Sequence, residues 1–250
     1  YGVPLTEFTS FDYGFDYENT VINTTDYTAT RILDFCRDNA TEDDCAFDAL
    51  KLSAGWTRDS RNRTIFATRG SVTSLGAQVA PAPGSVEFYK ADLRHQQYFA
   101  LTDSLTLAME GRLNYGEGFG DTTELPPFER YYAGGIRTLR GYKGNSLGPL
   151  DDEGDPLGGN ARVLGGAELI FPSPFSENSK STKLSAFVDA GNVYDTTDTG
   201  IDLGDLRYST GLSLVWMSPV GVLSFSVAEP INAKADDETE TFQFTLGSVY

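Results

Sequence analysis

The residues best suited to do chemistry in this sequence lie in a glycine-rich segment, 131–142, which reads YYAGGIRTLRGY. Its glycines let the backbone adopt positive φ and approach another surface closely. A guanidinium can bind a carboxylate through two parallel hydrogen bonds, which a lysine cannot do. The segment is therefore either a glycine-rich surface turn or a loop that folds back and places an arginine against an acidic surface.

The two cysteines, Cys36 and Cys45, lie nine positions apart in the polar segment DFCRDNATEDDC. No further cysteine and no nearby histidine accompanies them, which argues against a zinc site. We expect a loop disulfide formed in an oxidising compartment, rather than two free thiols.

Other reactive side chains are weaker candidates. Asp151, Glu153 and Asp155 have the spacing of a calcium-binding loop, but Arg162 stands at the twelfth position, where such a loop needs a glutamate. His95 is the single histidine, and no nucleophile elbow accompanies it. No phosphate-binding loop of the GxxxxGK[ST] type occurs. We therefore expect no enzyme, no metal and no cofactor, and we interpret the acidic cluster as a solvated loop.

The composition bears on the class of protein. With 36 acidic and 19 basic residues the formal charge is −17, and such a chain repels the phosphate backbone of nucleic acids. Aromatic residues make up 12% of the chain and there are 26 glycines, which is typical of all-β proteins. No run approaches the length of a membrane-spanning helix, whereas a spanning strand needs only ~10 alternating residues.

Apolar and polar residues alternate with period two in nearly every apolar segment, the pattern of strands with one apolar face. The sequence predicts about ten strands, near residues 7–20, 49–59, 70–80, 86–100, 104–117, 160–172, 182–193, 207–217, 221–229 and 240–249. The longest connections, 21–48 and 118–159, are acidic and fall on the same side of the sheet. Long strands with long loops on one side are typical of an outer-membrane barrel.

Five segments in order carry a resemblance to a known family. They are FERYYAGGIRTLRGYKGNSLGP (128–149), GGNARVLGGAELIFPSPF (158–175), FVDAGNVYD (187–195), LVWMSPVGVLSFSVAEP (214–230) and FQFTLGSVY (242–250). Together they resemble the C-terminal barrel of the BamA family of outer-membrane protein assembly factors, over essentially the whole chain. The Arg-Gly-aromatic motif alone identifies the wider insertase superfamily, whereas the WMSP turn and the last strand point to the BamA family.

The resemblance implies an all-β fold, an antiparallel transmembrane β-barrel of sixteen strands preceded by periplasmic POTRA domains. With about ten strands predicted, we expect residues 1–250 to form a single barrel domain truncated at its N-terminus, without the POTRA domains and first strands. Residues 118–159 would form a long extracellular loop that folds into the lumen. A barrel of only ten strands is too narrow to hold such a loop, which agrees with a larger barrel from which strands are missing here. The C-terminal strand, ending at Tyr250, would carry alternating Phe242, Phe244 and Leu246.

The family's sixth-loop motif, usually Val/Ile-Arg-Gly-Phe/Tyr, places its arginine inside the lumen against acidic residues of the barrel wall. The matching positions here are Leu139, Arg140, Gly141 and Tyr142, of which Leu139 departs mildly from the motif. We expect Arg140 to pair with Glu168 and Asp189, each the single acid on the polar face of its strand. The alternative is that both acids are simply hydrated lumen residues.

The function that the resemblance implies is the assembly and insertion of nascent β-barrel proteins into the bacterial outer membrane, through a weak lateral seam. The partners would be nascent outer-membrane proteins, accessory lipoproteins of the assembly complex, and a lipid bilayer with lipopolysaccharide, with the acidic loops facing the cell exterior. One alternative is a protein-translocating pore of the same superfamily, of the two-partner secretion or TamA type. Others are a passive porin or adhesin, and a soluble β-sandwich.

Overall fold

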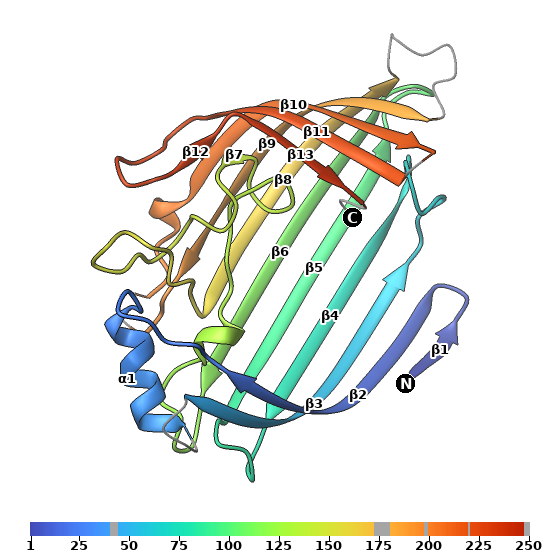
Figure 1. Cartoon of the computed structure of the whole chain (residues 1–250). Helices are drawn as coiled ribbons and strands as arrows, with labels where there is room; N and C mark the ends of the chain where they lie inside the picture. The colour runs from blue at the N-terminus through green and yellow to red at the C-terminus, as the bar shows by residue number, and fades with distance from the viewer. Residues whose placement is uncertain (41–44, 173–180, 198–199, 220, 248–250) are drawn as a thin grey trace.

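The computed structural model describes residues 1–40, 45–172, 181–197, 200–219 and 221–247, and its main feature is one curved, open antiparallel sheet (Figure 1). Eleven strands pair in the order of the sequence. They are β1 (Gly2–Thr6), β2 (Thr9–Val21), β3 (Ala46–Asp59), β4 (Gly70–Ala80), β5 (Phe88–Ala100), β6 (Thr106–Gly118), β8 (Ala161–Pro172), β9 (Thr182–Tyr194), β10 (Arg207–Ser218), β11 (Gly221–Pro230) and β13 (Phe242–Leu246). Among the described residues β1 and β13 do not pair, so the sheet is not closed.

The smaller elements lie in the connections. A helix, α1 (Thr30–Asn39), and two 3₁₀ turns, η1 (Pro127–Glu129) and η2 (Leu203–Asp205), interrupt three of the long loops. Two short strands, β7 (Gly141–Tyr142) and β12 (Thr239–Glu240), form a separate two-stranded sheet. No helix in the described part of the chain is long and apolar enough to cross a membrane.

The structure confirms the predicted fold class and places a strand at each of the ten predicted positions, but it corrects the details. The sequence missed β1, which has only five residues and contains Pro4, and it assigned α1 to a loop. Of the predicted last strand, 240–249, residues 242–246 form β13, Glu240 pairs with β7 instead, and residues 248 and 249 lie outside the described residues. Tyr250 lies outside the described residues.

The two faces of the sheet have the reverse of the polarity found in a soluble protein. On neighbouring β10 and β11, the cross-strand pair Leu212 and Val227 is 59% and 53% exposed on the outer face. The adjacent pair, Ser213 and Ser226, is buried on the concave face. The same alternation runs around the sheet, with exposed Phe15, Leu52, Leu75, Met109, Leu113, Phe242 and Phe244. Such an apolar outer surface suits hydrocarbon rather than water.

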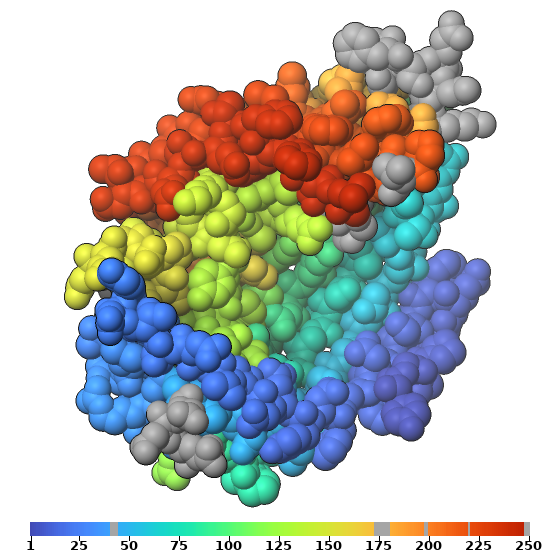
Figure 2. Space-filling model, viewed as in Figure 1, coloured from blue at the N-terminus to red at the C-terminus, as the bar shows by residue number. Residues whose placement is uncertain are grey.

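The apolar core lies between the concave face and the loops at one end of the strands. Figure 2 shows the connection between β6 and β8 (yellow-green) filling this end, while the rest of the concave face is hollowed. We call this connection, residues 119–160, the inner loop. One buried cluster joins it to α1 and β3 through Phe35, Phe47 and Leu125, and a second surrounds Leu139 and Tyr142.

The predicted disulfide is present and links α1 to the start of β3. Cys36 and Cys45 are bonded, with their Cα atoms 5.0 Å apart. The bond holds α1 so that Phe35 packs on Phe47, whose ring in turn packs on Phe128 of the inner loop, both at 5.4 Å between centroids. The helix and the inner loop therefore share one apolar cluster.

A charged side chain on the outer face of the sheet should destabilise the protein in a membrane. Leu212 is the sixth residue of β10, and replacing it with arginine should lower the free energy of unfolding by roughly 2–4 kcal/mol in lipid vesicles. The matched control is Leu203, which is equally exposed at 60% but lies in η2. Leu203→Arg should change the free energy of unfolding by less than about 0.5 kcal/mol. Urea unfolding in vesicles measures both, and equal small effects would show that the outer face is wet.

Loss of the disulfide should loosen α1 and leave the sheet intact. Closing a ring of this size contributes about 2–3 kcal/mol through the entropy of the open chain. Replacing Cys36 and Cys45 together with serine should therefore speed amide exchange in α1, with no change in β5. Exchange in α1 that stays at the native rate would mean that packing of Phe35 alone holds the helix.

Candidate functional site

The inner loop enters the concave face beside η1 and folds into a compact hairpin of its own. Its two arms are bridged by backbone pairs at Tyr131 with Gly159 and at Ala133 with Leu147. Gly134 has φ +106°, and a Cβ there would lie 2.1 Å from the carbonyl oxygen of Lys143. Only glycine fits this position, so the glycines of the 131–142 segment are what allow the loop to fold tightly.

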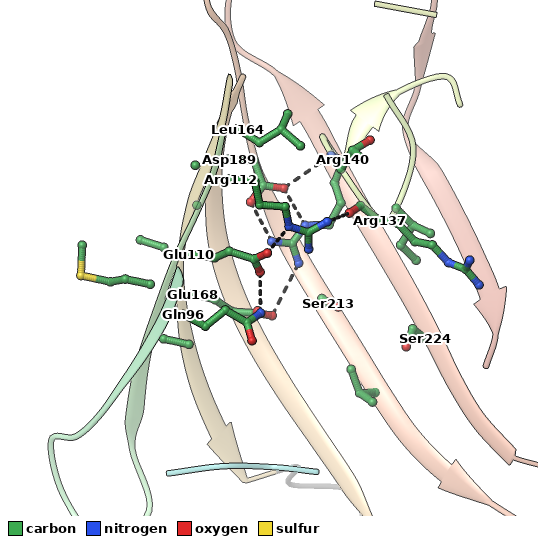
Figure 3. Close-up of a pocket in the computed structure, with 18 of the residues that line it drawn as sticks. Gln96, Glu110, Arg112, Arg137, Arg140, Leu164, Glu168, Asp189, Ser213 and Ser224 are labelled. Atoms are coloured by element: carbon green, nitrogen blue, oxygen red, sulfur yellow. Dashed lines mark hydrogen bonds and ion pairs between the residues drawn. The ribbon is translucent and has the colours of Figure 1, made fainter. Parts of the chain in front are cut away.

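The folded loop presents Arg140 to the inner wall formed by β8 and β9 (Figure 3). Its Nε and Nη2 atoms donate to the two carboxylate oxygens of Asp189 at 2.7 and 2.8 Å. Nη1 lies 3.5 Å from a carboxylate oxygen of Glu168, and the guanidinium carbon stands 3.4 Å from the ring centroid of Phe187. Gly166 is the cross-strand partner of Asp189 and leaves room for the Asp189 carboxylate, since a Cβ at position 166 would lie 2.9 Å from a carboxylate oxygen of Asp189.

The arrangement is electrostatically strong because water has little access to it. The side chains of Arg140, Asp189 and Glu168 are 14%, 8% and 19% exposed. A bidentate, charge-assisted pair fixes the direction of the guanidinium as well as its position. The hydroxyl of Ser185 donates to Glu168 and helps to satisfy the second carboxylate. The structure therefore brings together the three residues singled out from the sequence.

A second charged cluster supports the tip of the inner loop. Glu110 accepts from Arg94 at 2.9 Å and from Gln96 at 2.6 Å, and it also pairs with Arg112. Arg112 in turn donates to the backbone carbonyl of Arg137 at 3.2 Å. This cluster was not identified from the sequence, although its members occupy alternating positions on the inward faces of β5 and β6.

A third cluster, also missed, ties three loops together. Arg31 of α1 lies 2.6 Å from Glu124 and 2.8 Å from Asp195, and Arg130 lies 2.9 Å from the same glutamate. Glu124 and Arg130 belong to the inner loop, whereas Asp195 follows β9. Two arginines and two carboxylates thus balance their charges where the loops meet, and no local sequence pattern links them.

Two tyrosines of the inner loop form further contacts with the sheet. The hydroxyl of Tyr131 donates to Asp92 at 3.1 Å, and the ammonium group of Lys90 lies 4.7 Å from its ring centroid. Burial, with the nearby Asp92 carboxylate, raises the pKa of Tyr131. Burial also raises the pKa of Tyr142 to about 12, so its hydroxyl remains a donor to the Tyr208 carbonyl at 3.3 Å. Both phenols therefore act as fixed neutral donors.

The other singled-out residues fall into two groups. Leu139 and Tyr142 are fully buried in the second apolar cluster, and Gly141 begins β7. Phe242, Phe244 and Leu246 project from the outer face of β13 into the apolar belt and do not contact the arginine site. His95 also lies on the outer face, where its Nδ1 contacts the Thr73 hydroxyl at 2.8 Å.

Removing the guanidinium should undock the inner loop. Arg140→Ala leaves two poorly hydrated carboxylates without a cation, and we expect a loss of roughly 3 kcal/mol, the low end for a broken buried pair because some water reaches the site. Arg140→Lys should recover only part, since an ammonium cannot bind both oxygens in one plane. Amide exchange within residues 131–142 measures the change.

The matched control is Arg137→Ala, because among the described residues that exposed guanidinium donates to the Thr245 hydroxyl alone, at 3.4 Å. Adding Asp189→Asn to Arg140→Ala should restore part of the stability by removing an uncompensated charge. Native exchange rates in Arg140→Ala would mean that the apolar cluster, rather than the ion pair, holds the loop.

Comparison with known proteins finds relatives of this chain. The chain is 31% identical over 279 residues to the outer membrane protein assembly factor BamA of Neisseria meningitidis serogroup B, covering 99% of the chain and 35% of that protein. It is 26% identical to BamA of Nitratidesulfovibrio vulgaris, covering 100% of the chain and 31% of that protein. The sorting and assembly machinery component 50 homolog of Mus musculus is 31% identical over 57% of the chain and 31% of its own length.

The fold has a match among solved structures as well. The crystal structure of BamA from Haemophilus ducreyi lacking POTRA domains 1-3 superposes with a TM-score of 0.84 at 31% identity, covering 97% of this chain and 52% of that one. The chain spans about a third of the length of the two BamA relatives. These matches confirm the resemblance drawn from the sequence. Because the model of the Omp85 superfamily domain matches residues 1–250, the chain belongs to the Omp85 superfamily.

Proposed function

We propose that this protein assembles β-barrel proteins into the bacterial outer membrane. The observation that carries the proposal is the similarity, over the whole chain, to proteins named as outer membrane protein assembly factors. The apolar outer face of the sheet supports a membrane location. The long acidic loops would then face the cell exterior, and accessory lipoproteins and lipopolysaccharide would be its further partners.

The physical basis of such an activity would be the edge of the last strand. Among the described residues β13 pairs only with β11, over five residue pairs. An unpaired strand edge is a template for another strand, and backbone groups left unpaired in hydrocarbon cost several kcal/mol each. A client strand that pairs with β13 would satisfy its own backbone as it enters the bilayer. No catalytic step is required, so we propose that the protein is not an enzyme.

The register of β13 identifies which backbone groups a client would meet. The N–H of Gly247 donates to Val222, and the carbonyl of Thr241 accepts from Ala228, so the odd-numbered residues turn their backbone groups toward β11. Backbone direction alternates along a strand. The N–H groups of Phe242, Phe244 and Leu246 therefore point to the free edge.

A proline at an even-numbered position should test this function directly. Phe244→Pro removes a donor from the free edge and leaves the bonds to β11 in place, whereas Phe244→Leu keeps the donor. In vesicles that contain the intact protein, we expect Phe244→Pro to slow folding of an added, urea-unfolded outer-membrane protein at least ~10-fold, and Phe244→Leu to act like the native protein. The heat-dependent gel shift of the client measures its folding.

Two outcomes would contradict the proposal. One is client folding at the native rate with Phe244→Pro, provided that the variant itself resists urea like the native protein. The other is a large, stable conductance in planar bilayers together with no acceleration of client folding. That result would favour the translocating pore of the same superfamily.

A further inference from the structure

The last strand is joined to the inner loop by a side chain that the arginine site does not include. Gln243 lies on the concave face of β13 and is 4% exposed. Its Nε2 donates to the backbone carbonyl of Tyr142 at 2.7 Å, and its Oε1 accepts from the backbone N–H of Gly141 at 3.4 Å. One side-chain amide thus forms hydrogen bonds with the backbone of the two residues that directly follow Arg140.

The backbone around this contact makes the same connection. Gly141 and Tyr142 of β7 pair with Glu240 and Thr239 of β12, immediately before β13. The N–H of Lys143 donates to the carbonyl of Glu238 at 2.9 Å. The backbone of residues 238–240, just before the last strand, therefore pairs with the inner loop.

The inner loop can reach β13 because it lies flush against the neighbouring strands. Gly141 has φ +89°, and a Cβ there would lie 3.2 Å from the Cβ of Ala228 and 3.4 Å from that of Ser209. Small side chains on β10 and β11 thus form the floor on which the Arg-Gly-Tyr turn rests. A larger residue at Gly141 would be strained in φ and would lift the turn away from Gln243.

A strand as short as β13 depends on such side contacts. It has five residues and one neighbour in the described structure, whereas interior strands such as β5 have thirteen residues and two neighbours. The second contact between the loop and β13, from Arg137 to Thr245, is exposed and 3.4 Å long. Gln243, with both its polar atoms bonded in a buried place, is the stronger of the two.

We propose that Gln243 is a positioning residue that transmits the docking of Arg140 to the last strand, so that the inner loop sets how firmly β13 is held on β11. This inference rests on the proposed function, in which the free edge of β13 receives the client. When Arg140 is seated, Gly141 and Tyr142 stand where Gln243 can bind both. When the loop leaves, β13 keeps, among the described residues, its backbone bonds to β11.

Gln243→Met tests the proposal, because methionine keeps the length of the side chain and removes the two hydrogen bonds to Gly141 and Tyr142, together with a bond from Nε2 to the Glu240 carboxylate at 3.2 Å. Ser226→Ala is the matched control. Ser226 is the cross-strand partner of Gln243 on the same buried face, and its hydroxyl has no hydrogen-bond partner within the described residues. Both variants are made in the intact protein, alone and combined with Arg140→Ala, and reconstituted in phosphatidylcholine vesicles.

Hydrogen exchange of residues 238–247 is the first readout. Loss of two buried hydrogen bonds should speed exchange roughly 5–30-fold in Gln243→Met and leave it unchanged in Ser226→Ala. In the Arg140→Ala background Gln243→Met should add little, because the loop has already left and the local bond to Glu240 is all that the substitution then removes. If Gln243 acted only through packing within β13, Gln243→Met would instead speed exchange by the same factor in the Arg140→Ala background as in the native protein. Additive effects, or a Gln243→Met variant that exchanges like Ser226→Ala, would overturn the proposal.

Client folding, measured on the same vesicles, separates this inference from the proposed function. If Gln243→Met changes exchange as expected while Phe244→Pro leaves client folding unaffected, the positioning role stands and the assembly function fails. If Phe244→Pro blocks client folding while Gln243→Met leaves exchange unchanged, the reverse holds. Gln243→Glu keeps an acceptor for Gly141 but places a carboxylate against the Tyr142 carbonyl and the Glu240 carboxylate, so residues 238–247 should exchange at least as fast as in Gln243→Met.

Discussion

The ion pair between one guanidinium and the inner wall determines where the inner loop lies. Asp189 alone offers Arg140 two short hydrogen bonds in one plane, which fixes the orientation of the following Gly-Tyr pair as well as the position of the charge. Tyr142 can then be buried, and β7 can form. The apolar cluster around Leu139 and the two-stranded sheet with β12 both need the turn to be in this place.

The polarity of the sheet explains why a loop has to supply the core. With apolar side chains committed to the outer face, the concave face is left with serines, glutamines and charged residues that cannot form an apolar interior by themselves. The inner loop and α1 therefore bring the buried aromatic and aliphatic residues that pack at one end of the strands. Charged clusters at Glu110 and Glu124 satisfy the polar groups that this packing would otherwise leave without water.

Sequence reasoning identifies the features that repeat or that are local. Period-two alternation predicts the long strands, and the family resemblance, together with the single acid on each inward face, selects Glu168 and Asp189. It misses α1 because Phe35 is the only fully buried residue of a largely polar helix. It also misses the Arg31 cluster and Gln243, since both depend on segments far apart in the chain meeting in space. Nothing in FQFTL distinguishes a glutamine that binds a loop from one that is merely hydrated.

Under the proposed function, the direction of the backbone in β13 has a consequence for the choice of client. The residues whose N–H groups face the free edge are the same ones whose side chains face lipid, because both alternate with period two. An incoming strand shifted by one residue would turn its polar side chains into hydrocarbon. The edge would thus reject a misaligned strand on hydrophobicity alone, without any contact that reads particular amino acids. A single template of this kind can serve many unrelated sequences, provided that each alternates.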